Sequence, residues 1–181
     1  MNEGLIPSRY AKALFKFALE KKSDERLYGL MKNLVKTFAG EAALQQAVAN
    51  PFVSVEDKVK LLTTAAGAAP DDAVFNDFLH LLVENNRLAL IRDIALAYLR
   101  IYRDEHRIYL VTVTSAAPMD EADETRLKTL IERHLKGATM EYSHLTDPSL
   151  IGGFVVNINN EKLDASIANE LKQLRLKLLS N

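Results

Sequence analysis

Few residues of this 181-residue chain have the types and spacing that catalysis or metal binding requires. The sequence contains no cysteine, which excludes disulfide bonds, thiolate metal ligands and cysteine nucleophiles. Its four histidines stand too far apart for two of them to share a helix face at i, i+3 or i+4: His80, His106, His134 and His144. A metal site would need histidines that meet only in the folded chain, so we expect no metal and no cofactor.

The glycine and carboxylate pairs have structural interpretations. Gly152-Gly153 lacks the Lys-Ser or Lys-Thr of a phosphate-binding loop and the third glycine of a dinucleotide motif, so a tight turn at the start of a strand is expected. The acidic pairs stand at or near expected helix starts, where negative charge complements the helix dipole: Asp71-Asp72, Asp120-Glu121 and Asp123-Glu124. The sequence therefore predicts no catalytic residue. A small enzyme whose site forms only on folding stays as an alternative.

Charge and composition exclude further classes of protein. The chain has 23 basic and 24 acidic side chains and a net charge of −1, unlike proteins that bind nucleic acid by neutralising phosphates. Its N-terminus has no basic region followed by an apolar run, and no apolar stretch approaches the roughly 20 residues that span a bilayer. We expect a soluble protein with no nucleic-acid partner and no transmembrane segment of its own.

Residues 1–105 predict six helices. The first has apolar residues at helical spacing, at Tyr10, Ala13, Leu14, Phe17 and Ala18. The fifth has an apolar face wider than one core stripe needs, formed by Val74, Phe75, Phe78, Leu79, Leu81 and Leu82. Either both helices belong entirely to the core, or a groove between them receives an amphipathic helix of a partner.

Beyond His106 the pattern changes to strands and helices. Strands are expected over 108–114, 139–145 and 154–158, with a hairpin turn at Asn159-Asn160. Two helices carry apolar stripes, at Leu127, Leu130, Ile131 and Leu135 and at Ile167, Leu171, Leu174 and Leu178. The predicted fold is mainly α: a six-helix bundle over 1–105, followed by a small α/β domain over 106–181.

Several segments together indicate a family. Residues 7–15 resemble the opening helix of the delta subunit of F-type ATP synthase, the family of the oligomycin sensitivity-conferring protein. Asn50-Pro51-Phe52 with the following Lys58, and residues 84–88, are similar to its middle segments. Residues 147–156 and 163–167 resemble its signature region. Asn86 stands where many relatives have glycine, but asparagine also tolerates left-handed geometry.

The resemblance implies a non-catalytic stator subunit. In that family the N-terminal bundle binds the N-terminal helix of an alpha subunit, in a groove that involves the first and fifth helices. The C-terminal domain contacts the ends of the b subunits of the peripheral stalk. The subunit thereby holds the catalytic head against rotation, which couples ion-driven rotation to ATP synthesis.

Carried over to this sequence, the resemblance assigns head contacts and structural positions. The head-binding candidates, some of which must be core, are Tyr10, Ala13, Leu14, Phe17, Phe75, Phe78, Leu81 and Leu82. Gly152, Gly153 and Asp164 are expected to be structural, at the start of a strand and as a helix cap. Without a leader like an organelle transit peptide, the protein is expected at the cytoplasmic face of a bacterial inner membrane. An unrelated adaptor that docks amphipathic helices is the alternative function.

Overall fold

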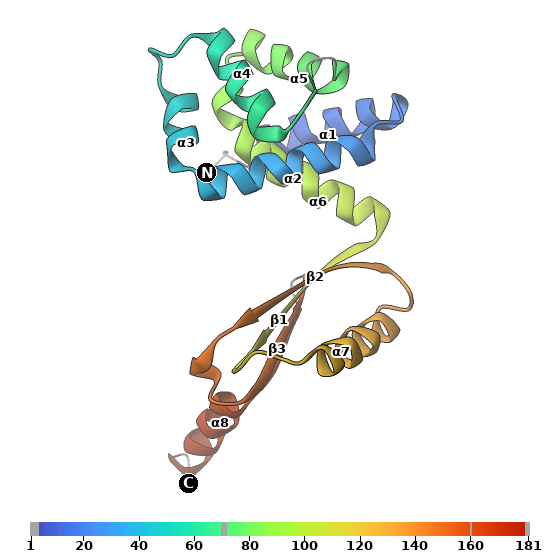
Figure 1. Cartoon of the computed structure of the whole chain (residues 1–181), viewed down its shortest axis with the longest axis vertical. Coiled ribbons are helices and arrows are strands. Elements are labelled where there is room, and N and C mark those ends of the chain that lie inside the picture. Colours follow the sequence, from blue (N-terminus) through green and yellow to red (C-terminus); the bar gives the residue numbers. More distant parts are fainter. Residues whose placement is uncertain (1–3, 70–71, 160, 180–181) are drawn as a thin grey trace. The chain divides into compact units, whose positions relative to one another are not determined.

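The computed structural model describes residues 4–69, 72–159 and 161–179 and forms two compact units, Met1–Glu105 and His106–Asn181 (Figure 1). Asp71, Asn160 and the side chain of Leu178 lie outside the described residues. The first unit is helical: α1 (Leu5–Glu20), α2 (Asp24–Gly40), α3 (Ala42–Ala49), α4 (Val55–Ala66), α5 (Ala73–Glu84), a 3₁₀ turn (Leu88–Leu90) and α6 (Ile91–His106). The prediction of a mainly α fold with an N-terminal six-helix bundle is confirmed.

Local interactions account for several helix ends in this unit. The Ser54 hydroxyl accepts a hydrogen bond from the Asp57 N–H (3.1 Å), and the Asp72 carboxylate accepts one from the Phe75 N–H (3.4 Å). Both satisfy a backbone donor that the first turn of a helix leaves unpaired. The α4 helix ends at Gly67, whose φ of 69° is the left-handed conformation that glycine adopts most easily.

The core of the first unit is built around α6. All seven apolar residues predicted for this last helix are buried: Leu88, Ile91, Ile94, Ala95, Tyr98, Leu99 and Tyr102. The Phe15 ring of α1 packs edge-on against Tyr98, with 5.9 Å between ring centroids. The Tyr98 hydroxyl donates to the Asp24 carbonyl oxygen at 3.2 Å, which satisfies its polar end inside the bundle.

The inward face of α1 differs from the predicted stripe. Its buried residues are Pro7, Ala11, Leu14, Phe15 and Ala18. Ala13 is exposed, and Tyr10 and Phe17 are only partly buried. Because α1 is apolar around much of its circumference, several faces of the helix fit the same periodicity, and packing against α6 and α2 selects one of them.

The second unit is a sheet with two helices. Its elements are β1 (Ile108–Ser115), α7 (Glu121–His134), β2 (Thr139–Thr146), a 3₁₀ turn (Pro148–Leu150), β3 (Gly153–Ile158), β4 (Glu161–Ser166) and α8 (Ile167–Leu179). The strand order is β2-β1-β3-β4, with β1 and β2 parallel and joined through α7. The β1–β3 and β3–β4 pairs are antiparallel. This arrangement confirms the predicted small α/β part of the fold.

The α7 helix lies along one face of this sheet (Figure 1). Ile131 is buried with Val111, Val113 and Val156, and the partly buried Leu127 and Leu135 pack against the same cluster. Leu130, also predicted to point inward, is instead 61% exposed, so that prediction is wrong. Ile131 is the single fully buried residue of α7, and half-buried neighbours complete the contact of a helix that covers one sheet face.

Candidate partner-binding surfaces

An apolar strip of α1 lies outside the core of the bundle. Ala13 is exposed and Tyr10 and Phe17 are half-buried, at a spacing of three and four residues that places them on one helix face. The ammonium of Lys21 lies 5.6 Å from the centre of the Phe17 ring, a cation–π contact at the end of the strip. We call Tyr10, Ala13 and Phe17 the α1 strip.

The remaining head-binding candidates divide between core and surface. Leu14 of α1 and Phe75, Phe78 and Leu82 of α5 are buried in the bundle. Leu81 of α5 is 43% exposed. The structure therefore leaves the α1 strip and Leu81 as the candidates that an incoming helix can reach without opening the core.

A partly exposed ion pair fixes the start of α5. The buried Asp72 carboxylate accepts the Phe75 N–H and lies 2.8 Å from the Nε of Arg26 on α2. The guanidinium is itself largely exposed, so solvent screens much of this attraction. The pair links the first turn of α5 to α2 and thereby positions the helix that carries Leu81.

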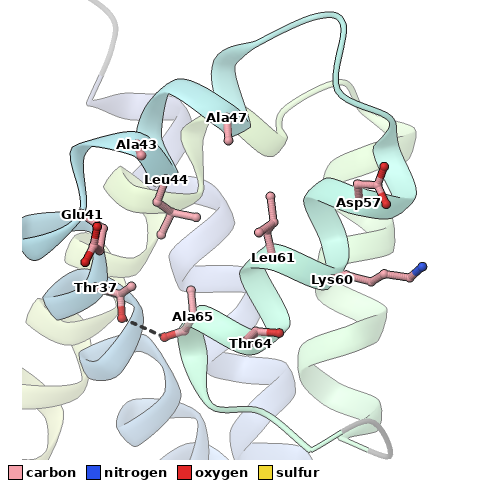
Figure 2. A pocket seen from close by; sticks show the side chains of 10 residues that line it. All are labelled: Thr37, Glu41, Ala43, Leu44, Ala47, Asp57, Lys60, Leu61, Thr64 and Ala65. Carbon is pink, nitrogen blue, oxygen red and sulfur yellow. Dashed lines mark hydrogen bonds between the residues drawn. The ribbon is translucent and has the colours of Figure 1, made fainter.

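A second apolar surface lies between α3 and α4 (Figure 2). It is a groove of about 690 Å³, lined by Thr37, Glu41, Ala43, Leu44, Ala47, Asp57, Lys60, Leu61, Thr64 and Ala65. Figure 2 shows Leu44 and Leu61 projecting from the two helices toward each other, with the polar side chains at the margins. The Thr37 hydroxyl donates to the Ala65 carbonyl oxygen at 3.0 Å and ties α2 to the end of α4. We call this feature the α3–α4 groove.

The side chains that line the α3–α4 groove are suited to binding an apolar surface rather than to catalysis. The Asp57 carboxylate, at its margin, accepts the Ser54 hydroxyl at 2.7 Å. Acid–base catalysis needs titratable groups that converge on one reacting position, and the polar groups here line the margins. Sequence reasoning missed this groove, although the small residues Ala43 and Ala47, one turn apart on α3, are a signal that could have indicated it.

In the second unit, α8 presents an exposed apolar face. Ile167, Leu171 and Leu174 follow helical spacing, and Leu171 and Leu174 are 51% and 54% exposed. Two further exposed apolar residues of this unit are Leu163 of β4 and Ile151. Rows of exposed apolar side chains of this kind mark protein-interaction surfaces more often than solvent-facing helix surfaces.

The family resemblance assigns structural roles to Gly152, Gly153 and Asp164, and these residues lie where β3, β4 and α8 meet. Gly153 has a φ of +72°, and a Cβ added there would meet the Ala165 carbonyl. The Asp164 carboxylate accepts the Ser166 N–H (3.2 Å) and hydroxyl (2.6 Å) and lies 3.0 Å from the Lys162 ammonium. The Ser166 hydroxyl in turn accepts the Asn169 N–H at 3.2 Å, in the first turn of α8. These hydrogen bonds, above all from Ser166, lower the pKa of Asp164.

A serine and a histidine also meet in the sheet. The Ser115 hydroxyl is 2.7 Å from the Nε2 of His144 and donates its own proton to the Ala117 carbonyl oxygen at 2.5 Å. Because the hydroxyl gives its proton to the backbone, it accepts a hydrogen bond from the imidazole. A serine nucleophile is activated by the reverse arrangement, in which its hydroxyl donates a hydrogen bond to the imidazole. The pair connects β1 to β2 and does not form a catalytic dyad.

Among the residues that the structure describes, no three histidine, aspartate or glutamate side chains gather in a way that could hold a metal ion. None of the helices, as far as the structure describes them, combines the length and the apolar character needed to cross a bilayer.

Comparison with known proteins gives one consistent result. Residues 6–178 match the family model described as ATP synthase delta (OSCP) subunit. The chain is 40% identical over 181 residues to ATP synthase subunit delta of Parabacteroides distasonis, covering 100% of this chain and 99% of that one. Its identity to the Bacteroides thetaiotaomicron subunit is 37% over 176 residues, covering 97% and 94%.

A solved structure shares the fold. A chain of the Toxoplasma gondii mitochondrial ATP synthase hexamer, determined by cryo-EM, superposes with a TM-score of 0.75. The identity between the two sequences is 24%, over 96% of this chain and 97% of the other.

Proposed function

The chain belongs to the ATP synthase delta (OSCP) subunit family, and from this premise we propose that it is a non-catalytic stator subunit. In this proposal its first unit binds the N-terminal helix of an alpha subunit of the catalytic head. Its second unit binds the C-terminal ends of the b subunits of the peripheral stalk. The joint resists the torque of the rotor, so that ion-driven rotation is coupled to ATP synthesis.

The observation that carries the head contact is the α1 strip. Tyr10, Ala13 and Phe17 are apolar residues on a face of α1 that the core of the bundle does not cover. Ala13 has a small side chain, which lets the backbone of a second helix approach closely. Leu81 adds an exposed apolar residue on α5, the other helix of the proposed groove. An amphipathic helix is the partner that such a surface fits best.

The stalk contact is supported by α8. Its exposed Ile167, Leu171 and Leu174 form an apolar face that a partner helix can cover. Two attachments on one chain hold better than one, since the second becomes intramolecular once the first has formed. Effective concentration of this kind raises retention by roughly 10²-fold or more.

Such a subunit would be peripheral to the membrane. We place it at the cytoplasmic face of a bacterial inner membrane, where the catalytic head of the synthase would lie. Its partners would then be the alpha and b subunits, with no nucleic acid and no cofactor.

The experiment is a calorimetric titration of the full chain with a synthetic peptide of the alpha-subunit N-terminal helix. We expect one-to-one binding with a negative heat-capacity change, because apolar surface is buried. Ala13→Glu should weaken binding at least about tenfold, since a charge would be desolvated at the contact. Its matched control is Ala39→Glu, at an exposed position of α2.

Two results would count against the head contact. One is unchanged affinity of the Ala13→Glu variant in a chain whose circular dichroism and thermal unfolding match those of the parent. The other is the absence of the chain from the intact synthase when the complex is purified from cells.

The second candidate function is a general adaptor that docks amphipathic helices, and the α3–α4 groove is the observation that favours it. Selectivity separates the two functions. A stator subunit should prefer the alpha-subunit peptide over an amphipathic helix of unrelated sequence, whereas a general adaptor should bind both with similar affinity.

A further inference from the structure

All but one of the charged side chains of α1 are positive. From Leu5 to Leu19 the charged side chains are Arg9, Lys12 and Lys16, and the single carboxylate of the helix is Glu20, its last residue. All three cations are exposed. No ion pair within 4.0 Å joins them to a carboxylate in the part of the chain that the structure describes. The helix therefore presents uncompensated positive charge to whatever covers it.

These cations border the α1 strip on its outer side. Arg9 stands four residues before Ala13 and Lys16 three residues after it, so both flank Ala13 on the same helix face. The buried residues of α1, such as Ala11 and Phe15, lie on the opposite side. A helix seated on Ala13 consequently has Arg9 and Lys16 along one of its edges.

We propose, on the basis of the stator function above, that the partner helix covering the α1 strip is acidic along the edge that faces Arg9 and Lys16. Its apolar face would contact Tyr10, Ala13 and Phe17, and its carboxylates would lie over the two cations. An edge of lysines would place like charges together at the margin of an apolar contact. Complementary charge speeds association and fixes the orientation of the docked helix more than it adds raw affinity.

The same cations could in principle contact an anionic lipid surface. Membrane-binding basic clusters usually contain about four to eight Lys or Arg residues. This one has three within α1 and Lys21 at the end of the strip, which is the bottom of that range. The small side chain of Ala13 between Arg9 and Lys16 suits the backbone of a helix rather than a plane of headgroups. The peptide partner is therefore the inference that the surface favours, and the membrane is an outcome of the test.

The test uses the full chain and two designed helical peptides with the same apolar face, one with a glutamate edge and one with a lysine edge. We expect the glutamate peptide to bind about tenfold more tightly at 50 mM salt, with a difference that shrinks at 500 mM because salt screens exposed charges. Arg9→Glu/Lys16→Glu should reverse the preference. The matched control, Lys36→Glu/Arg100→Glu at exposed positions of α2 and α6, should leave it unchanged.

Equal binding of the two peptides overturns the inference, and so does a preference that survives Arg9→Glu/Lys16→Glu. Binding of the chain to vesicles with anionic headgroups, lost in that double variant while neither peptide binds, overturns it in favour of a membrane contact.

A third titration, with the alpha-subunit N-terminal peptide, separates this inference from the stator function. If that peptide binds with no dependence on salt or on Arg9 and Lys16, the stator function stands and the acidic edge is wrong. If it fails to bind while the glutamate peptide shows the expected preference, the charge preference stands and the proposed alpha-subunit contact is wrong.

Discussion

Gly153 faces the backbone of Ala165 so closely that a Cβ at position 153 would overlap the Ala165 carbonyl oxygen. Gly153 is also the first residue of β3, has a φ of +72°, and pairs with Ser166 at the end of β4. The close approach joins β3 to the segment from which α8 begins. Two separate requirements, the left-handed backbone and the missing Cβ, thus fall on one glycine.

We therefore predict that Gly153→Ala destabilises the second unit by about 2–4 kcal/mol, since it adds an overlap with backbone to the strain of a left-handed alanine. Gly137→Ala is the matched control: its φ is +77°, but no described atom lies within 4 Å of a Cβ built there. That variant should lose only about 1 kcal/mol. Urea unfolding with hydrogen exchange of the β3 and β4 amides measures both. Equal losses would mean that backbone strain alone requires glycine at 153.

Removal of the Asp72 carboxylate should destabilise the first unit. Asp72→Ala deletes both the cap of α5 at the Phe75 N–H and the contact with Arg26, and we expect a loss of about 1–2 kcal/mol. Arg26→Ala should cost less, since its guanidinium is largely solvated. A double-mutant cycle by thermal unfolding measures the coupling, and a value near zero would assign the whole effect to the cap.

Acid should weaken the junction between β4 and α8. Hydrogen bonds from Ser166, with a contribution from Lys162, lower the pKa of Asp164 below its ordinary value of 3.8. Because the folded state then binds this proton more weakly than the unfolded state, Asp164 contributes stability above pH 3.8 and loses it as the pH falls through its folded pKa. Asp164→Asn should therefore reduce the drop in melting temperature between pH 5 and pH 3. An unchanged drop would show that other carboxylates control acid unfolding.

Alkali should weaken the first unit. Burial, with a smaller contribution from the charge of Asp24, raises the pKa of Tyr98 above its ordinary value of 10.0. The unfolded chain then releases the proton first, so this contribution to stability is present below pH 10 and is lost as the pH rises above it. Tyr98→Phe should be less stable at neutral pH, by about 1 kcal/mol for the lost hydrogen bond to Asp24, yet lose less between pH 9 and pH 11. Thermal unfolding at these pH values tests both effects.

Sequence periodicity predicts which residues of a helix are buried when only one face of the helix is apolar. All seven residues predicted for the last helix of the first unit are buried, six of them on α6 and Leu88 in the 3₁₀ turn before it, since the other positions of α6 are mostly charged or small. On α1, Tyr10, Ala13 and Phe17 fit helical spacing as well as Ala11 and Phe15 do. Which set is buried depends on how α1 packs against α2 and α6, and a local pattern does not contain that information. The same limit applies to Leu130 of α7, which fits the predicted stripe but is exposed.

Surfaces made by two elements are harder still to predict. Leu44 and Leu61 line the α3–α4 groove because α3 and α4 leave space between them, and nothing in either helix alone specifies that spacing. The role of Asp164 likewise depends on Ser166 and Asn169, which β4 and the first turn of α8 bring together. The sequence indicated Asp164 only through family resemblance, and the physical reason for its position is visible in the fold.

The exposed leucines of α8 should matter for binding but not for folding. Leu171 and Leu174 are 51% and 54% exposed, so Leu171→Ser/Leu174→Ser should change the free energy of unfolding by less than about 0.5 kcal/mol per residue. If α8 is the stalk contact, the same variant should bind a C-terminal fragment of the b subunits at least about tenfold more weakly, because apolar anchors dominate such interfaces. Lys172→Ser/Gln173→Ser, on the opposite side of the helix, is the control and should bind normally. Equal binding by both double variants, measured by calorimetry, would place the stalk contact elsewhere on the second unit.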